Sequence, residues 1–70
     1  MKTGDKVMIR YAGRDVIGEI KLASPNERSL LLVFDTILGG YVNAMPVMKE
    51  GDGIYYELFN HEPVIVERMS

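Results

Sequence analysis

Residues 4–22 read GDKVMIRYAGRDVIGEIKL and contain two runs in which apolar and polar residues alternate. In the first run Val7, Ile9 and Tyr11 fall on one face, which is the two-residue period of a strand with one buried side. Gly13, between the runs, can adopt the positive φ that a tight reversal requires. The stretch therefore predicts a β-hairpin around which the rest of the chain is organised.

The second run places Val16, Gly18, Ile20 and Leu22 on a common face, which we expect to point into the core. Gly18 is unusual in such a strand, because a glycine there marks a bulge or the close approach of another backbone. We expect Gly18 to lie at a bend of a strongly curled small sheet.

The stretch that follows supplies further strands. Residues 30–34 (LLLVF) are apolar on both faces and predict a central strand, covered on one side by the core and on the other by a loop or a partner chain. Residues 41–48 alternate loosely but contain Pro46, which favours an edge or interrupted strand.

The last third predicts a second hairpin from residues 54–59 and 63–69, although residues 55–59 fit a single helical turn equally well. Short strands at this spacing, with no substantial helix, predict an all-β chain. We expect one small barrel domain of five to six short antiparallel strands over residues 1–70.

The composition limits the chemistry that one chain can perform. There is no cysteine among the 70 residues, which removes disulfides, thiolate nucleophiles and thiolate metal ligands. The single histidine cannot build a three-histidine zinc site within one chain. We therefore predict no catalytic residue, no cofactor and no metal, and favour a protein that is not an enzyme.

The sequence also bears on location and partners. No apolar run follows the positive charge of the first five residues (MKTGD), so no signal peptide is predicted. The longest apolar run, residues 30–34, is far shorter than the roughly twenty residues that span a bilayer. The net charge of −2 does not favour nucleic acid. We expect a cytoplasmic protein without a membrane partner.

Few side chains suggest chemistry. His61 lies in a polar turn and is predicted to be a surface residue rather than a general base or metal ligand. Glu50, Asp52 and Glu57 carry oxygens that suit a divalent cation, but they lack the spacing of a calcium loop. We interpret them as a solvated acidic turn.

The residue types suggest two hypothetical binding sites. The first is a basic, partly aromatic strip for single-stranded nucleic acid, in which acidic residues are interleaved: Arg10, Tyr11, Arg14, Lys21 and Arg28. The second is a cleft for a small ligand or peptide, for which core filling is the simpler interpretation: Tyr41, Met45, Met48 and Tyr55.

Met8, Ile17 and Ile65 fall opposite the faces assigned to the core. With part of residues 30–34 they would form an exposed apolar patch, and such patches mark interfaces. The alternative is that a curled barrel covers them with its own loops. We expect self-association, most simply as a symmetric dimer, with another protein as the alternative partner.

The strand pattern resembles an SH3-like barrel. GDKV at residues 4–7 with GEI at residues 18–20 is similar to the opening hairpin of many such domains, including the type II dihydrofolate reductases, and ERM at residues 67–69 is similar to their closing strand. This resemblance implies an SH3-like barrel. It implies, as an alternative function, an oligomeric ligand-binding protein or enzyme with Ile54 and Tyr55 lining a shared pore.

Two further resemblances bear on function. VMIR at residues 7–10, through Gly13 to Gly18, is similar to the first motif of Sm-like proteins, which implies weak RNA binding. The chain also resembles small SH3-like proteins of unassigned function, such as those on bacterial mobile gene cassettes. We favour this last resemblance, and with it a non-catalytic binding or assembly module that self-associates.

Overall fold

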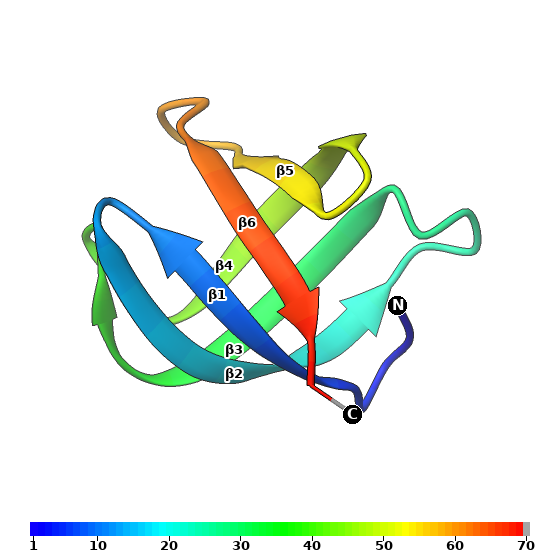
Figure 1. Cartoon of the computed structure of the whole chain (residues 1–70), viewed down its shortest axis with the longest axis horizontal. Helices are drawn as coiled ribbons and strands as arrows, with labels where there is room; N and C mark the ends of the chain where they lie inside the picture. The colour runs from blue at the N-terminus through cyan, green and yellow to red at the C-terminus, as the bar shows by residue number, and fades with distance from the viewer. Residues whose placement is uncertain (70) are drawn as a thin grey trace.

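The computed structural model describes residues 1–69, and strands are their only regular secondary structure (Figure 1). In chain order the strands are β1 (Lys6–Tyr11), β2 (Arg14–Ala23), β3 (Ser29–Leu38), β4 (Tyr41–Gly51), β5 (Ile54–Glu57) and β6 (Pro63–Arg68). Each strand pairs antiparallel with the next, and β6 pairs with β1, so the sheet closes into a barrel. The prediction of a small all-β antiparallel barrel is confirmed, with six strands. Residues 1–69 include no helix that could cross a membrane.

The opening hairpin forms as predicted. Tyr11 of β1 lies opposite Arg14 of β2, so Ala12 and Gly13 alone make the turn. Both turn residues have positive φ, 52° and 76°, the combination that matches a two-residue turn to the twist of its strands. Local turn chemistry therefore fixes the register of the first two strands.

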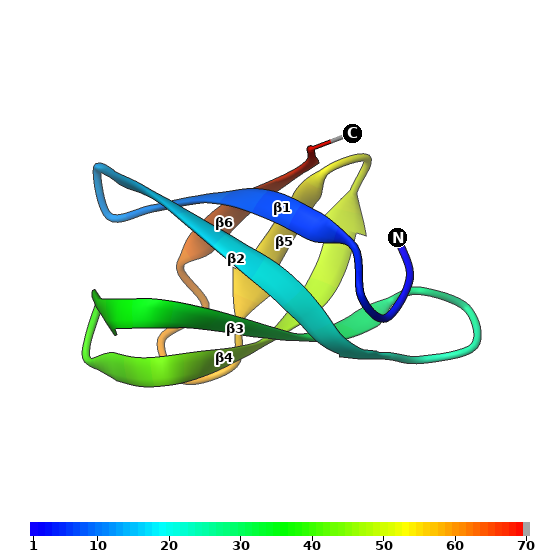
Figure 2. The ribbon, with the colours of Figure 1, turned by 90° about the horizontal axis from the view of Figure 1, so that it is seen from below.

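The inward-facing residues of all six strands fill the barrel. The buried apolar residues are Val7, Ile9, Tyr11, Ile20, Leu30, Leu32, Phe34, Leu38, Met45, Val47, Tyr55, Val64 and Val66. β3 lies between β2 and β4, as predicted for a central strand. Figure 2 shows β3 and β4 along one side of the barrel and β1 and β6 along the other.

The alternation of β2 breaks after Ile20. The register between β2 and β3 shifts between Ile20 and Leu22, which leaves Lys21 as an extra residue. An extra residue exchanges the inner and outer faces of the strand beyond it. Leu22 is therefore 60% exposed, while Ala23 packs against the core. The expectation that Leu22 points inward was wrong, because a bulge has no signature in the alternation itself.

β4 and β5 show where Pro46 lies in its strand and which conformation residues 55–59 adopt. β4 has a neighbour on both sides, but β5 pairs only with residues 47–51, so Pro46 lies where β4 has no partner on its β5 side. β5 ends at Glu57 and a turn covers residues 58–60, so residues 55–59 begin as strand and end as turn.

Gly18 is required by the close approach of β3. A Cβ at this position would lie 2.5 Å from the carbonyl oxygen of Val33 and 2.7 Å from Cδ1 of Ile9. Real Cβ contacts are never so short, so a side chain would force strands apart. The expectation of a close backbone approach at Gly18 is confirmed.

We predict that Gly18→Ala lowers the free energy of unfolding by about 1–3 kcal/mol, the usual cost of overpacking a filled interior. Gly51→Ala is the matched control, because a Cβ there would meet nothing within 4 Å and its φ is not positive. The control should change the free energy by less than about 0.5 kcal/mol. Urea unfolding followed by circular dichroism measures both, and equal values for the two variants would contradict the close approach.

Candidate functional site

A carboxylate lies inside the barrel. Glu57 is the last residue of β5 and is fully buried. The strand alternation that points Tyr55 inward points Glu57 inward as well. The interpretation of Glu57 as part of a solvated acidic turn was therefore wrong. In residues 1–69 no three acidic or histidine side chains cluster closely enough to hold a metal ion.

Backbone N–H groups of the β5–β6 loop surround this carboxylate. Oε1 of Glu57 accepts hydrogen bonds from the N–H of Phe59 at 2.9 Å and of Asn60 at 2.7 Å. Oε2 accepts one from the N–H of Glu62 at 2.8 Å. Such charge-assisted bonds are roughly twice as strong as neutral ones. The loop thus folds around the Glu57 side chain.

Two tyrosines connect Glu57 to other strands. The hydroxyl of Tyr41, the first residue of β4, donates to Oε1 at 2.7 Å. The hydroxyl of Tyr11, the last residue of β1, lies 3.4 Å from Oε2, a longer and weaker contact. We call Glu57, Tyr11 and Tyr41 the Glu57 cluster. It joins β1, β4 and the β5–β6 loop at one end of the barrel.

The surroundings of the Glu57 cluster lower the pKa of Glu57 and raise the pKa of Tyr41. Burial alone would raise the pKa of Glu57, but hydrogen bonds from Asn60, Tyr41, Glu62 and Phe59 outweigh it and lower that pKa to about 2. Burial and the bond to the Glu57 carboxylate raise the pKa of Tyr41 to about 12. Neither group exchanges a proton near neutral pH, so the cluster acts as a structural clamp rather than an acid or base.

An aromatic surface lies next to the clamp. Phe59 is 83% exposed, and its ring meets the ring of Tyr41 edge-on, with centroids 6.5 Å apart. A hollow of about 270 Å³ lies beside them, bordered by Gly39, Gly40 and Asn60. The residues that hold Glu57 therefore also fix an apolar side chain in solvent.

The cleft expected from tyrosine and methionine is not assembled on the surface. Met45 and Tyr55 are buried in the core, as the core-filling interpretation predicts. Tyr41 lies at the hollow beside Phe59. Met48 lies on the outer side of β4, where its Sδ accepts a hydrogen bond from the Ser29 hydroxyl. The four residues thus occupy three different places.

The basic strip is divided in the same way. Arg10 forms ion pairs with Asp15 and Glu67, and Tyr11 is buried. Arg14 donates a hydrogen bond to the carbonyl of Ile37 at the hairpin tips. Lys21 occupies the bulge of β2, and Arg28 lies in the β2–β3 loop. The buried Tyr11 is not available to stack on a base. His61 is exposed, as predicted, and stacks on Tyr56 with centroids 5.0 Å apart.

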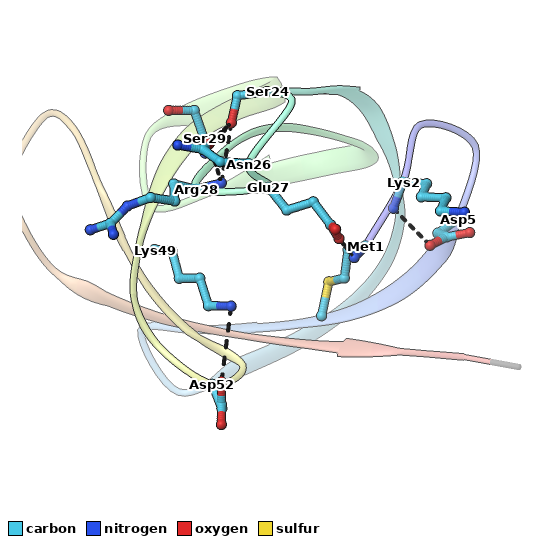
Figure 3. Close-up of polar contacts among 10 residues, drawn as sticks. All are labelled: Met1, Lys2, Asp5, Ser24, Asn26, Glu27, Arg28, Ser29, Lys49 and Asp52. Atoms are coloured by element: carbon cyan, nitrogen blue, oxygen red, sulfur yellow. Dashed lines mark hydrogen bonds and ion pairs between the residues drawn. The ribbon is translucent and has the colours of Figure 1, made fainter.

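The loop between β2 and β3 is held by its own polar groups (Figure 3). Oγ of Ser24 accepts hydrogen bonds from the N–H of Arg28 at 3.1 Å and of Ser29 at 3.0 Å. Asn26 Oδ1 accepts a further bond from the N–H of Arg28, and the α-amino group of Met1 pairs with Glu27. The backbone of Arg28 is therefore fixed where β3 begins.

Apolar side chains form a continuous patch on the outside of the barrel. Leu22, Leu31 and Pro46 are direct neighbours across β2, β3 and β4. Val33 and Ala44 form the adjacent pair on β3 and β4. Leu22 is exposed, and the other four are half-buried. We call these five residues the outer β2–β4 face.

The three residues first expected to form the self-association face lie on the outside of the adjacent strands β2, β1 and β6, in neighbouring rows. Met8 and Ile17 lie opposite each other on β1 and β2. Ile65 lies opposite Arg10 on one side and Ile54 on the other, and it is 41% exposed. The ion pair of Arg10 with Glu67 crosses between Met8 and Ile65. The outer β2–β4 face instead includes β3, whose residues 30–34 are apolar on both faces.

We predict that Glu57→Gln lowers the free energy of unfolding by at least about 2 kcal/mol. The amide group can accept hydrogen bonds only through its oxygen, so its NH₂ group would face backbone N–H donors. Glu62→Gln is the control, because the Glu62 side chain is exposed, and it should cost less than about 0.5 kcal/mol. Urea unfolding at pH 7 compares them, and a Glu57→Gln variant as stable as the control would show that the clamp is dispensable.

Acid should weaken the clamp in a defined range. The folded-state pKa of Glu57, about 2, lies below its ordinary value of 4.5, so its contribution is fully present above pH 4.5 and is lost as the pH falls toward 2. The difference in unfolding free energy between the wild type and Glu57→Gln should therefore shrink across this range. Urea titrations at pH 7, 4 and 2.5 measure it, and a difference that stays constant would contradict an ionised Glu57.

Comparisons with protein-family models, with curated proteins and with solved structures find no match to this chain. Two features of residues 1–69 are therefore relevant to function. The Glu57 cluster holds one end of the barrel together. The outer β2–β4 face presents apolar side chains to solvent, and it is the candidate functional surface.

Proposed function

We propose that this protein is a non-catalytic β-barrel module that self-associates through the outer β2–β4 face. The observation that supports the proposal is the row formed by Leu22, Leu31 and Pro46, which lies across three adjacent strands on the outside of the barrel. Soluble proteins rarely expose a contiguous apolar patch without using it. A second copy of the chain is the occupant to which we commit.

Self-association suits a patch of this kind. Burying one aliphatic side chain of the size of leucine is worth about 1.5–3 kcal/mol, and a two-fold interface makes each contact twice. The patch is a strand surface, so it is rigid before association and little conformational entropy is lost. Leu22 gains most, since it is 60% exposed in the free chain.

The Glu57 cluster supports a binding role rather than catalysis. Both Glu57 oxygens are occupied by donors, and its pKa of about 2 keeps it ionised at neutral pH. The finer family assignment, to small SH3-like barrels of the mobile-gene-cassette type, is part of this proposal and rests on the opening hairpin at residues 4–20. A cytoplasmic location stays a prediction from the sequence.

Sedimentation velocity tests the proposal. At micromolar concentration the wild type should sediment as a species larger than the 7.9 kDa chain. Leu22→Lys places a charge on the β2 side of the outer β2–β4 face, at its most exposed residue, and should raise the dimer dissociation constant at least about tenfold.

Ile65→Lys is the matched control. Ile65 is also an exposed strand residue, 41% exposed, but it lies on β6, away from the outer β2–β4 face. It should leave the assembly unchanged, and circular dichroism should show both variants folded. A monomeric wild type would overturn the proposal. An assembly that Ile65→Lys disrupts and Leu22→Lys does not would place the interface at Ile65 instead.

A further inference from the structure

We propose that the hollow beside Phe59 binds a small organic cation of the quaternary ammonium type. The aromatic rings of Tyr41 and Phe59 and the buried charge of Glu57 would hold it. No residue that borders the hollow belongs to the outer β2–β4 face. The proposal therefore adds a ligand site to the proposed self-association and does not rest on it.

The hollow has a size and a lining that suit a small apolar group. Its volume is about 270 Å³, below the roughly 300–1,000 Å³ of pockets that take drug-sized ligands. Gly39 and Gly40 border it with backbone alone, and a Cβ at Gly40 would meet no atom within 4 Å. The turn between β3 and β4 therefore leaves space for the methyl groups of a ligand.

Two aromatic rings border the same hollow. The planes of the Tyr41 and Phe59 rings are 81° apart and their centroids are 6.5 Å apart, so the rings form a corner. The face of an aromatic ring carries partial negative charge and attracts cations, and quaternary ammonium ions are recognised in this way. Because Phe59 is 83% exposed, its ring is accessible to a ligand.

The charge of Glu57 lies directly behind this corner. Tyr41, Phe59 and Asn60 border the hollow, and all three donate hydrogen bonds to one carboxylate oxygen, Oε1 of Glu57, at 2.7, 2.9 and 2.7 Å. A charge inside a protein is screened less than a charge in water. The field of the carboxylate therefore reaches the hollow through the residues that border it.

No cation within residues 1–69 forms an ion pair with Glu57. The ion pairs of this part of the chain are Met1 with Glu27, Arg10 with Asp15 and with Glu67, and Lys49 with Asp52. The N–H and O–H donors around Glu57 satisfy its oxygens and leave its negative charge uncompensated. Among ligands of similar size and shape, the charge thus favours a cation.

The chemistry of the hollow favours a quaternary ion over a primary ammonium group. A primary ammonium is strongly hydrated and needs acceptors for its three N–H donors. Both Glu57 oxygens already accept hydrogen bonds from the protein. A quaternary ammonium ion has no N–H donor, and its methyl groups suit aromatic rings while its charge is attracted by Glu57.

Choline and its neutral isostere 3,3-dimethylbutan-1-ol test the proposal, because they have nearly the same shape and differ in charge. Added to ¹⁵N-labelled protein at pH 7, choline should shift the amide NMR signals of Gly39, Gly40, Phe59 and Asn60 with a millimolar dissociation constant. The isostere should bind at least about fivefold more weakly. Sodium chloride at equal ionic strength is the blank. No shift of these signals at about 100 mM choline, or equal binding of the two compounds, would overturn the proposal.

Variants at the aromatic corner provide a second test. Phe59→Leu removes one ring and should weaken choline binding at least about fivefold. The fold should persist, because the Phe59 side chain is exposed and its backbone N–H still donates to Glu57. Leu58→Ala is the matched control, since Leu58 is 47% exposed on the same turn and does not border the hollow. It should change binding by less than about twofold, and an equal effect of the two variants would overturn the site.

Two further measurements identify the source of the cation and separate this site from the proposed function. A short peptide that carries trimethyllysine presents the same group on a chain. Tighter binding of the peptide than of choline would indicate a protein segment as the source, and weaker binding would indicate a free cation. Leu22→Lys should bind choline as the wild type does. Choline binding by a monomeric wild type would overturn the proposed self-association while this site stands.

Discussion

One buried carboxylate, that of Glu57, ties β1, β4 and the β5–β6 loop together at one end of the barrel. β5 has only four residues, too few for a long ladder on either side. Glu57 compensates by binding three N–H groups of the loop that leads to β6, together with the hydroxyl of Tyr41 on β4. A buried charge is stable only when its hydrogen bonds are satisfied, and here the loop, the strand ends and the carboxylate satisfy one another. The order of the β5–β6 loop and the ionisation of Glu57 are therefore coupled.

Much of the fold follows from local sequence rules. The two-residue turn at Ala12 and Gly13, the alternation of β1 and the need for a glycine at position 18 are each set by neighbours a few residues apart or by backbone sterics. The strand at residues 30–34 was predictable as central because it is apolar on both faces. These features require no knowledge of which distant strands meet.

The features that the sequence did not predict depend on distant contacts. Leu22 turns outward because Lys21 is an extra residue against β3, and nothing in the β2 alternation marks that position. Glu57 is buried among donors from its own loop and from Tyr41, which lies sixteen residues earlier in the chain. An inward-facing glutamate between a strand and a turn was the available signal. The sequence alone does not place Tyr41 or the loop N–H groups around it.

Two departures from the usual distribution of residues, one charge inside the barrel and apolar side chains outside it, bear on stability. A chain of this length buries only about 60% of its unfolded surface, so its margin of stability is small. It holds a charge in its interior and leaves Leu22, Leu31 and Pro46 outside. Any process that covers those side chains in the folded state alone adds to the folding free energy by mass action. Association through the outer β2–β4 face would therefore stabilise β3, the strand that contributes the most residues to the core, and would make folding and assembly thermodynamically linked.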